Sequence, residues 1–403
     1  MNWRVGVGHF ETTPTMRKYM DSVLDSGRLS YGPMSKKLEE RFAKMHGCDY
    51  GVLSSSGTSS LQVALQAMKE YYDWPDGAEV IVPAVTFVAT INIVLHNNLT
   101  PVLVDVDPHT YNMDPQAAQD AITSETVCMI PVHLFGQPAN MQKIYRHVPT
   151  RIRFLEDSCE CVLATHHGEK VGSLGDVGCF SFYMAHILTA GVGGIATTRN
   201  KDLADIMRSL VNHGRQIKSG GDIDIKASDQ VRRGRFLFER IGHSHRVTEM
   251  ESALALAQLQ KLKTHIAARQ DNAGLLTKGL SKWTWNASQG SGYRLQLPRI
   301  EQGNTHSFMM YPIIYAGAGQ AGRDKWDLCA WLEDHGIETR EMLPLTNQPV
   351  YKDLFTEDDY PIAKTINEQG LYVGIHQGIS IEDLDYMIEV FDEYFRNHAG
   401  DKG

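Results

Sequence analysis

Short apolar runs alternate with helix-forming segments through the first two thirds of the chain. Residues 79–83, 101–108 and 128–136 are three such runs, separated by segments with helical periodicity. Buried strands that alternate with helices are joined by crossover connections, which give a mainly parallel sheet with helices on both faces. The sequence therefore predicts an α/β fold for this part of the chain.

The composition changes near residue 262, which indicates a second unit. Strand-like and helical segments alternate again over 293–340, and an amphipathic helix with acidic residues in its first turn is expected from residue 381. A chain of 403 residues is long enough for more than one core. We therefore expect a large α/β domain with an N-terminal helical segment over 1–262, and a small C-terminal α/β domain over 263–403.

Capping residues mark two helix starts. Residues 11–47 are predicted to form a helix, a turn and a second helix, with Ser35 capping the second. Thr248 and Glu251 have the spacing of a capping box ahead of another long helix.

Charge and cysteine content exclude several classes of function. The net charge of −9, without a basic block, argues against a nucleic-acid partner or an anionic membrane surface. Because no long apolar run occurs, we expect no membrane span and a cytoplasmic protein. Six cysteines do not indicate a disulfide framework, and the close pair Cys159 and Cys161 misses the usual metal spacing. No metal site is predicted.

A candidate anion site follows the apolar run that begins at Tyr50. The run leads into Gly57, Thr58 and Ser59, after which a helical pattern rich in Ala and Leu begins. Such a turn presents unpaired amides at the positive end of a helix, which suits a phosphate. A simple helix cap is the alternative for this pattern taken alone.

Two further candidates follow predicted strands. Asp157 ends the run from Arg153, with Glu160 close behind, and ligands of open α/β sheets gather at the carboxyl ends of strands. A helix-capping Asp followed by a surface Glu is the alternative. Phe87 follows the 79–83 run, and the bare pattern fits an apolar helix residue in the core equally well.

A histidine lies in a tight turn between two apolar runs. The stretch 178–194 contains an apolar run, the turn with His186 and a glycine-rich segment, and a second run follows at 195–198. Imidazole titrates near neutrality, so His186 is a candidate for moving protons. A core histidine in a strand is the alternative.

These motifs, in this order, resemble the DegT/DnrJ/StrS sugar aminotransferases of pyridoxal phosphate fold type I. The similar stretches are Ser-Gly-Thr before the Ala-Leu helix, Val-Pro-x-x-Thr-Phe, Glu-Asp-x-x-Glu, Ser-Phe-Tyr, and Arg-Val-Thr-Glu, spread over roughly residues 5 to 395. The resemblance implies the aspartate-aminotransferase fold, with a large mainly parallel αβα domain and a small C-terminal α/β domain. It also implies a homodimer with shared active sites.

The resemblance also implies which residues bind the cofactor phosphate. Gly57, Thr58 and Ser59 match the family's phosphate loop, and Ser181 matches its phosphate-binding serine. Ser244 replaces an asparagine that reaches the phosphate in the partner subunit, and its hydroxyl can still donate a hydrogen bond.

Three residues match the positions around the cofactor ring. Phe87 is expected to stack on the ring, and Asp157 to form an ion pair with the ring nitrogen, because a protonated ring is the electron sink. Glu160 stands near the cofactor hydroxyl, where the family usually has glutamine or histidine.

The family's Schiff-base lysine is replaced by His186, and histidine cannot hold the cofactor covalently. The stretch is similar to a branch with the same exchange, the nucleotide-sugar 3-dehydratases. That resemblance implies that pyridoxamine phosphate binds noncovalently and that the substrate is a nucleotide-linked 4-keto-6-deoxy sugar, which loses its C3 hydroxyl. It implies that His186 is the acid and base. It also implies glutamate as the amino donor that converts the spent pyridoxal phosphate back into pyridoxamine phosphate. No iron–sulfur cluster is expected, since the loop 216–235 has no cysteine.

Two alternatives remain open at this point. One is a nucleotide-sugar aminotransferase that lacks the usual lysine, although Lys170 and Lys201, the nearest lysines in sequence, match no cofactor position. The other is a catalytically inactive family member that binds cofactor or sugar.

Overall fold

A seven-stranded sheet dominates the computed structural model, which describes residues 3–216, 236–284, 294–316, 323–343 and 345–398. Its strand order is β1-β9-β8-β5-β4-β2-β3. The strands are β1 (Tyr50–Ser54), β2 (Glu79–Pro83), β3 (Thr100–Val104), β4 (Thr126–Met129), β5 (Arg153–Asp157), β8 (Val177–Ser181) and β9 (Gly194–Thr198). Only β9 runs against its neighbours, and the other adjacent pairs are parallel. The predicted mainly parallel sheet is confirmed.

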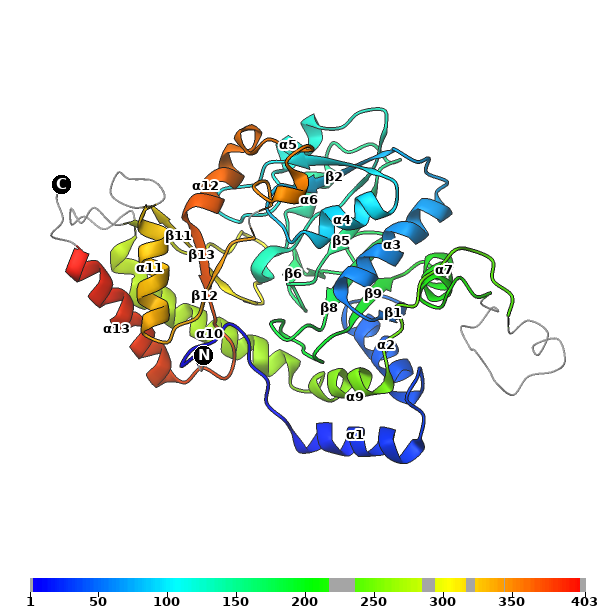
Figure 1. Cartoon of the computed structure of the whole chain (residues 1–403), viewed down its shortest axis with the longest axis horizontal. Helices are drawn as coiled ribbons and strands as arrows, with labels where there is room; N and C mark the ends of the chain where they lie inside the picture. Colours follow the sequence, from blue (N-terminus) through cyan, green and yellow to red (C-terminus); the bar gives the residue numbers. More distant parts are fainter. Residues whose placement is uncertain (1–2, 217–235, 285–293, 317–322, 344, 399–403) are drawn as a thin grey trace.

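Helices cover both faces of this sheet (Figure 1). Along β2, Val80 and Val82 belong to the large buried cluster under α3 and α4, whereas Ile81 belongs to the cluster under α5 and α6. None of the helices in the described ranges is both long and apolar enough to cross a bilayer. The helices on or beside this sheet are α1 (Pro14–Ser26), α2 (Pro33–Met45), α3 (Gly57–Tyr71), α4 (Ala89–His96), α5 (Pro115–Asp120), α6 (Met141–Tyr145), α7 (Lys201–Val211), α9 (Glu249–Gln258) and α12 (Pro361–Gln369).

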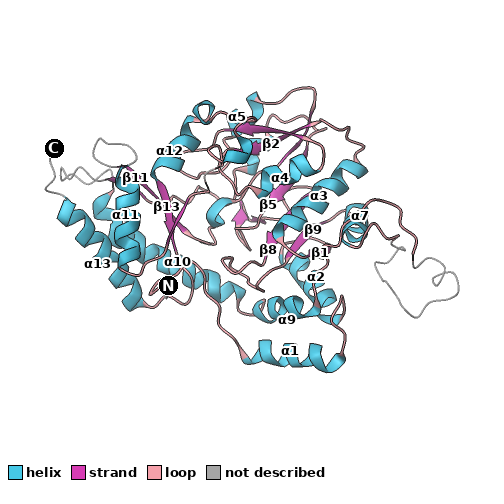
Figure 2. Ribbon diagram, in the orientation of Figure 1, coloured by secondary structure: helices cyan, strands magenta, loops and turns pink. Residues whose placement is uncertain are grey.

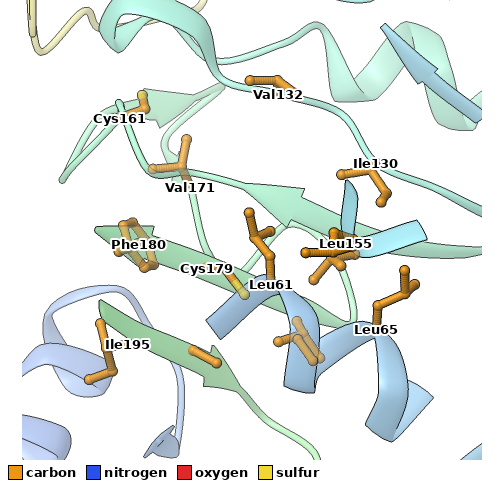
Figure 3. Close-up of a cluster of buried hydrophobic side chains, with 14 of the residues drawn as sticks. Leu61, Leu65, Ile130, Val132, Leu155, Cys161, Val171, Cys179, Phe180 and Ile195 are labelled. Atoms are coloured by element: carbon orange, nitrogen blue, oxygen red, sulfur yellow. The ribbon is translucent and has the colours of Figure 1, made fainter. Parts of the chain in front are cut away.

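Helix α3 is anchored to the centre of the sheet by apolar side chains. Leu61 and Leu65 are buried in the same cluster as Leu155 of β5 and Cys179 of β8 (Figure 3). Burying a leucine side chain stabilises the fold by about 1.5–3 kcal/mol. This packing fixes the first turn of α3 relative to the ends of β5 and β8.

A second, antiparallel sheet has the order β10-β11-β13-β12 and packs against α11 and α13 (Figure 2). Its buried cluster includes Val5, which pairs with Ile337, while Ala363 and Ile366 of α12 belong to the large cluster. The division into 1–262 and 263–403 therefore stays a prediction, because each unit contributes residues to the core of the other. The elements are β10 (Arg294–Gln296), β11 (Tyr311–Ala316), β12 (Thr339–Glu341), β13 (Gly370–Val373), α11 (Arg323–Asp334) and α13 (Ile381–His398); a hairpin, β6 (Thr165–His166) with β7 (Glu169–Lys170), stands apart.

The long helix predicted after Thr248 is present as two consecutive helices, α9 and α10 (Leu262–Leu280). Thr248 and Glu251 form the predicted capping box. Leu262 is buried in the large cluster and Leu276 in the second one. Helix α10 therefore bridges the two cores, and its middle lies between them.

The prediction that Ser35 caps α2 is wrong. Ser35 lies inside the helix, and the carboxylate of Glu249 in α9 accepts hydrogen bonds from the amides of Gly32, Met34 and Ser35 at 2.8–2.9 Å. A carboxylate with two acceptor oxygens satisfies three of the free amides at the positive end of a helix, which a single hydroxyl cannot do. The turn before α2 is thereby fixed to the start of α9.

Candidate active site

The candidate residues from three strands meet at one edge of the large sheet. Strand β1 ends at Ser54, β5 at Asp157 and β8 at Ser181, and these three strands run in the same direction. The first turn of α3 begins at Gly57, just beyond β1. Ligands of open α/β sheets bind at this edge.

The first turn of α3 packs closely against the end of β8. A Cβ atom at Gly57 would lie 2.7 Å from the Cβ of Ser181 and 2.9 Å from the Sγ of Cys159, so only glycine allows this approach. The side chain of Ser56 caps the helix by accepting from the Ser59 amide at 3.0 Å. The amides of Gly57 and Thr58, which come before the first intrahelical hydrogen bond, can hold a phosphate together with the nearby hydroxyls.

A Gly57→Ala variant tests this close approach. The added methyl group must displace Ser181 or Cys159, so we expect a loss of about 1–3 kcal/mol in the free energy of unfolding. We also expect weaker binding of inorganic phosphate and of pyridoxamine phosphate, measured by calorimetry. The control is Gly274→Ala in α10, where a Cβ has no neighbour within 4 Å, and which we expect to be stabilising. Equal effects at the two positions would contradict the packing argument.

Asp157 is buried and has neutral partners. One carboxylate oxygen accepts from the Thr90 hydroxyl at 2.9 Å and the other from the Cys159 amide at 3.2 Å. Burial raises its pKa, and among the described residues no lysine or arginine forms an ion pair with it. The alternative of a helix cap is wrong, because Asp157 ends β5 and a turn follows. A cationic ring nitrogen would supply the missing charge partner.

Phe87 lies immediately before α4 with 57% of its surface exposed, so the alternative of a core residue is wrong. The segment is tied to Asp157, because the Thr86 and Thr90 hydroxyls are 2.8 Å apart and Thr90 donates to the carboxylate. An exposed aromatic face held beside a buried carboxylate suits a planar ligand with a cationic ring.

Glu160 is partly buried, and its carboxylate accepts from the Phe135 amide at 2.7 Å. Burial raises its pKa to about 7, and the charge of Asp157 adds to the rise. Near neutral pH this carboxyl group is therefore protonated in a large share of molecules, and a protonated carboxyl donates a hydrogen bond as glutamine or histidine would.

His186 lies in the loop between β8 and β9, partly exposed, so the alternative of a core histidine in a strand is wrong. Its amide donates to the carbonyl of Tyr183, and its Nδ1 lies 3.3 Å from the Sδ of Met309. Burial, together with a smaller effect of the positive charge of Arg269, lowers its pKa to about 4. The imidazole is thus neutral at pH 7 and can accept a proton.

Ser244 precedes His245, whose carbonyl accepts from the Ser55 amide at 2.7 Å beside the first turn of α3. Its hydroxyl is exposed and accepts from the Arg246 guanidinium at 3.1 Å. Within the described part of the chain it forms no hydrogen bond with the other candidates. Met309 contacts His186, and Arg269 donates to the carbonyl of Met309. Neither could be found from the sequence, because both come from distant segments and follow no local motif.

The two lysines nearest in sequence have other partners. Lys170 donates to the carbonyl of Met45, and Lys201 forms an ion pair with Asp205 on the surface of α7. Neither amine takes part in the site around Asp157.

The described residues fit pyridoxal phosphate. The first turn of α3 at Gly57 presents backbone amides to a phosphate. Asp157 is a buried carboxylate that has no cationic partner among the described residues, and Phe87 exposes an aromatic face. These three features correspond to the anionic, cationic and planar parts of that cofactor.

Comparison with known proteins agrees with this chemistry. The profile of the DegT/DnrJ/EryC1/StrS aminotransferase family matches residues 11–392. GDP-perosamine synthase of Caulobacter vibrioides is 34% identical over 94% of both chains. The dTDP-4-dehydro-2,6-dideoxy-D-glucose 3-dehydratase of Saccharopolyspora spinosa is 29% identical over 91% of this chain and 81% of its own.

A solved structure with a bound cofactor is also similar. The Escherichia coli GDP-4-keto-6-deoxy-D-mannose-3-dehydratase with bound hydrated pyridoxal phosphate aligns with a TM-score of 0.86 and 27% identity, covering 97% of this chain and all of the other. The aminotransferase fold expected from the sequence is confirmed, with its parallel sheet and its second, smaller sheet.

Proposed function

The chain belongs to the DegT/DnrJ/EryC1/StrS aminotransferase family, and on that basis we propose that it removes the C3 hydroxyl of a nucleotide-linked 4-keto-6-deoxy sugar. Its cofactor is pyridoxal phosphate together with the pyridoxamine form. The observation that carries the proposal is His186, a neutral imidazole where an aminotransferase of this family has its lysine. A residue that cannot form a Schiff base but can move protons favours elimination over amine transfer.

Each cofactor-binding residue has one task in this proposal. Gly57, Thr58, Ser59 and Ser181 hold the phosphate, and Asp157 keeps the ring nitrogen protonated by its charge. Phe87 covers one face of the ring, and Glu160 donates to the ring hydroxyl. Bound pyridoxamine phosphate supplies the amine that captures the sugar ketone and the ring that accepts electrons.

His186 moves the proton of the elimination. Its low pKa leaves the imidazole unprotonated at neutral pH, so it accepts a proton and then returns it to the departing C3 hydroxyl as water forms. With glutamate as the amino donor, the overall change balances: sugar and glutamate give the 3-deoxy-4-keto sugar, 2-oxoglutarate and ammonia. The hydroxyl is replaced by hydrogen, and the two electrons come from glutamate.

Mass spectrometry of the product tests the proposal. The purified full chain is incubated with pyridoxamine phosphate, glutamate and a panel of nucleotide-linked 4-keto-6-deoxy sugars. We expect a product that lacks one oxygen atom, together with released ammonia. A product that carries a new amine would overturn the dehydratase assignment in favour of an aminotransferase, the activity named for the Caulobacter vibrioides relative. If no sugar reacts while the cofactor binds, the result favours a catalytically inactive binding protein over a dehydratase of this substrate class.

We further propose a homodimer with shared active sites. The hydroxyl of Ser244 is exposed and accepts from Arg246, and its own hydrogen can be donated to a group of a second copy. Large apolar side chains are also exposed around the same edge, among them Tyr183 at 56% and Val192 at 53%. Such exposure is typical of a surface that a second chain covers. Sedimentation of the full chain as a monomer would contradict this proposal.

A further inference from the structure

Arg269, in the middle of α10, is a buried cation. It is 1% exposed, and among the described residues no carboxylate lies within ion-pair distance. Its Nη1 donates to the carbonyls of Phe308 and Met309 at 3.1 and 2.8 Å, and its Nε donates to the side-chain oxygen of Gln377 at 3.2 Å. A buried charge costs folding free energy unless it is fully hydrogen-bonded, so this one calls for an explanation.

The two carbonyls that Arg269 holds belong to a constrained turn beside His186. Phe308 has φ +45°, which is unfavourable for a residue with a side chain. Met309 donates its amide to the carbonyl of Phe135 at 3.0 Å and places its Sδ 3.3 Å from Nδ1 of His186. A thioether only accepts hydrogen bonds, and weakly. The contact therefore favours the form with hydrogen on Nδ1 and the free lone pair on Nε2.

We propose that Arg269 is a positioning residue for His186, acting through the turn at Met309 and through its own positive charge. The guanidinium holds the turn, the thioether orients the imidazole, and the charge disfavours a second proton on the ring. This inference rests on the proposed role of His186 in moving protons. It assigns to Arg269 no contact with substrate or cofactor.

The other titratable groups around Arg269 do not replace its charge. Burial lowers the pKa of His306 and of His376 to about 3, so both rings are neutral at pH 7. His265 on the same helix also has a lowered pKa. The groups that face Arg269 and His186 are His265 of α10, His306 before β11, His376 and Gln377 after β13, His9 of the N-terminal segment and Tyr183 of the His186 loop, with Glu11 and Asp383 farther out.

Histidine NMR on the full-length protein, with and without pyridoxamine phosphate, tests the proposal without measuring turnover. The His186 signal is assigned by its loss in His186→Asn. We expect Arg269→Met to raise the pKa of His186 by about half a unit or more, because a nearby positive charge is removed. Arg269→Lys keeps the charge and should leave the pKa low. Lys263→Met removes a charge from an exposed position of the same helix and is expected to change nothing.

A second variant, Met309→Leu, leaves Arg269 in place and so tests the proposal even if the arginine variants misfold. Leucine has a volume similar to that of methionine but no sulfur. We expect nitrogen shifts of His186 that report a mixture of its two neutral forms, where the unaltered protein has hydrogen on Nδ1. A His186 titration in Arg269→Met that superimposes on the unaltered one would overturn the charge effect, and unchanged nitrogen shifts in Met309→Leu would overturn the orienting contact. Failure of the sugar assay alone would refute the proposed function and leave these titrations standing.

Discussion

Substitution of His186 by asparagine is expected to lower the rate of dehydration by a factor of about 10² to 10⁴, the usual contribution of a positioned acid or base. Asparagine is smaller and polar, so the partly exposed loop accepts it, but it takes up no proton at neutral pH. The carbonyl of Tyr183 still accepts a hydrogen bond from the backbone amide of residue 186, because that hydrogen bond does not involve the side chain. We therefore expect folding and cofactor affinity to persist while turnover is lost.

The measurements are single-turnover dehydration of the sugar, the melting temperature and the dissociation constant of pyridoxamine phosphate. His167→Asn is a matched control, since it makes the same chemical change in the hairpin after β6, at φ +49°, a conformation that asparagine tolerates. We expect its turnover to equal that of the unaltered protein. Undiminished dehydration in His186→Asn would remove His186 as the base.

The pH dependence of turnover gives an independent check. Because the pKa of His186 is lowered to about 4, the imidazole is unprotonated over the whole neutral range. Its contribution as a base is therefore lost only as the pH falls toward 4, well below the ordinary titration range of histidine. A rate that already falls by half near pH 6.5 would show that the base has an ordinary pKa.

The positions of the candidate residues could be predicted from the sequence wherever local pattern decides them. Asp157 and Ser181 end apolar runs, and Gly57 begins a helix, so each lies at the carboxyl edge of a parallel sheet once the alternation of strands and helices is recognised. The resemblance then supplied their roles. These are short-range patterns, and the parallel arrangement of the strands is enough to bring the three residues to one edge of the sheet.

Long-range contacts could not be predicted in this way. Ser35 has the right residue type for a helix cap, but Glu249, 214 positions later, competes for the same amides and binds them with a full charge. Phe87 has the same local pattern whether it is buried or exposed. Arg269 and Met309 matter because α10 bridges two cores and places its middle beside the His186 loop, a property of the tertiary fold alone.

An Asp157→Asn variant is expected to bind pyridoxamine phosphate about 10²- to 4 × 10³-fold more weakly. A buried charge pair that loses one partner loses about 3–5 kcal/mol, and each 1.4 kcal/mol is a factor of ten in affinity. Asparagine keeps an oxygen for the Cys159 amide, whereas its NH2 group faces the Thr90 hydroxyl, which must then accept instead of donate. Calorimetry with pyridoxamine phosphate measures the loss, and Asp176→Asn, a carboxylate that binds Phe154 and Tyr72 before β8, should leave the affinity unchanged.

The stability of the cofactor-free variant is expected to change in the opposite direction. Burial raises the pKa of Asp157 above its unfolded value, so the stability contributed by its protonated form is lost as the pH rises through the folded pKa. Above the unfolded pKa the unaltered protein therefore loses stability, because burial disfavours the charged carboxylate, and asparagine removes that cost. We expect a higher melting temperature without cofactor and a much smaller rise when cofactor is added. A residue with a purely structural role would lower both quantities, so a fall in the melting temperature of the cofactor-free variant would contradict the assignment of Asp157 to the ring nitrogen.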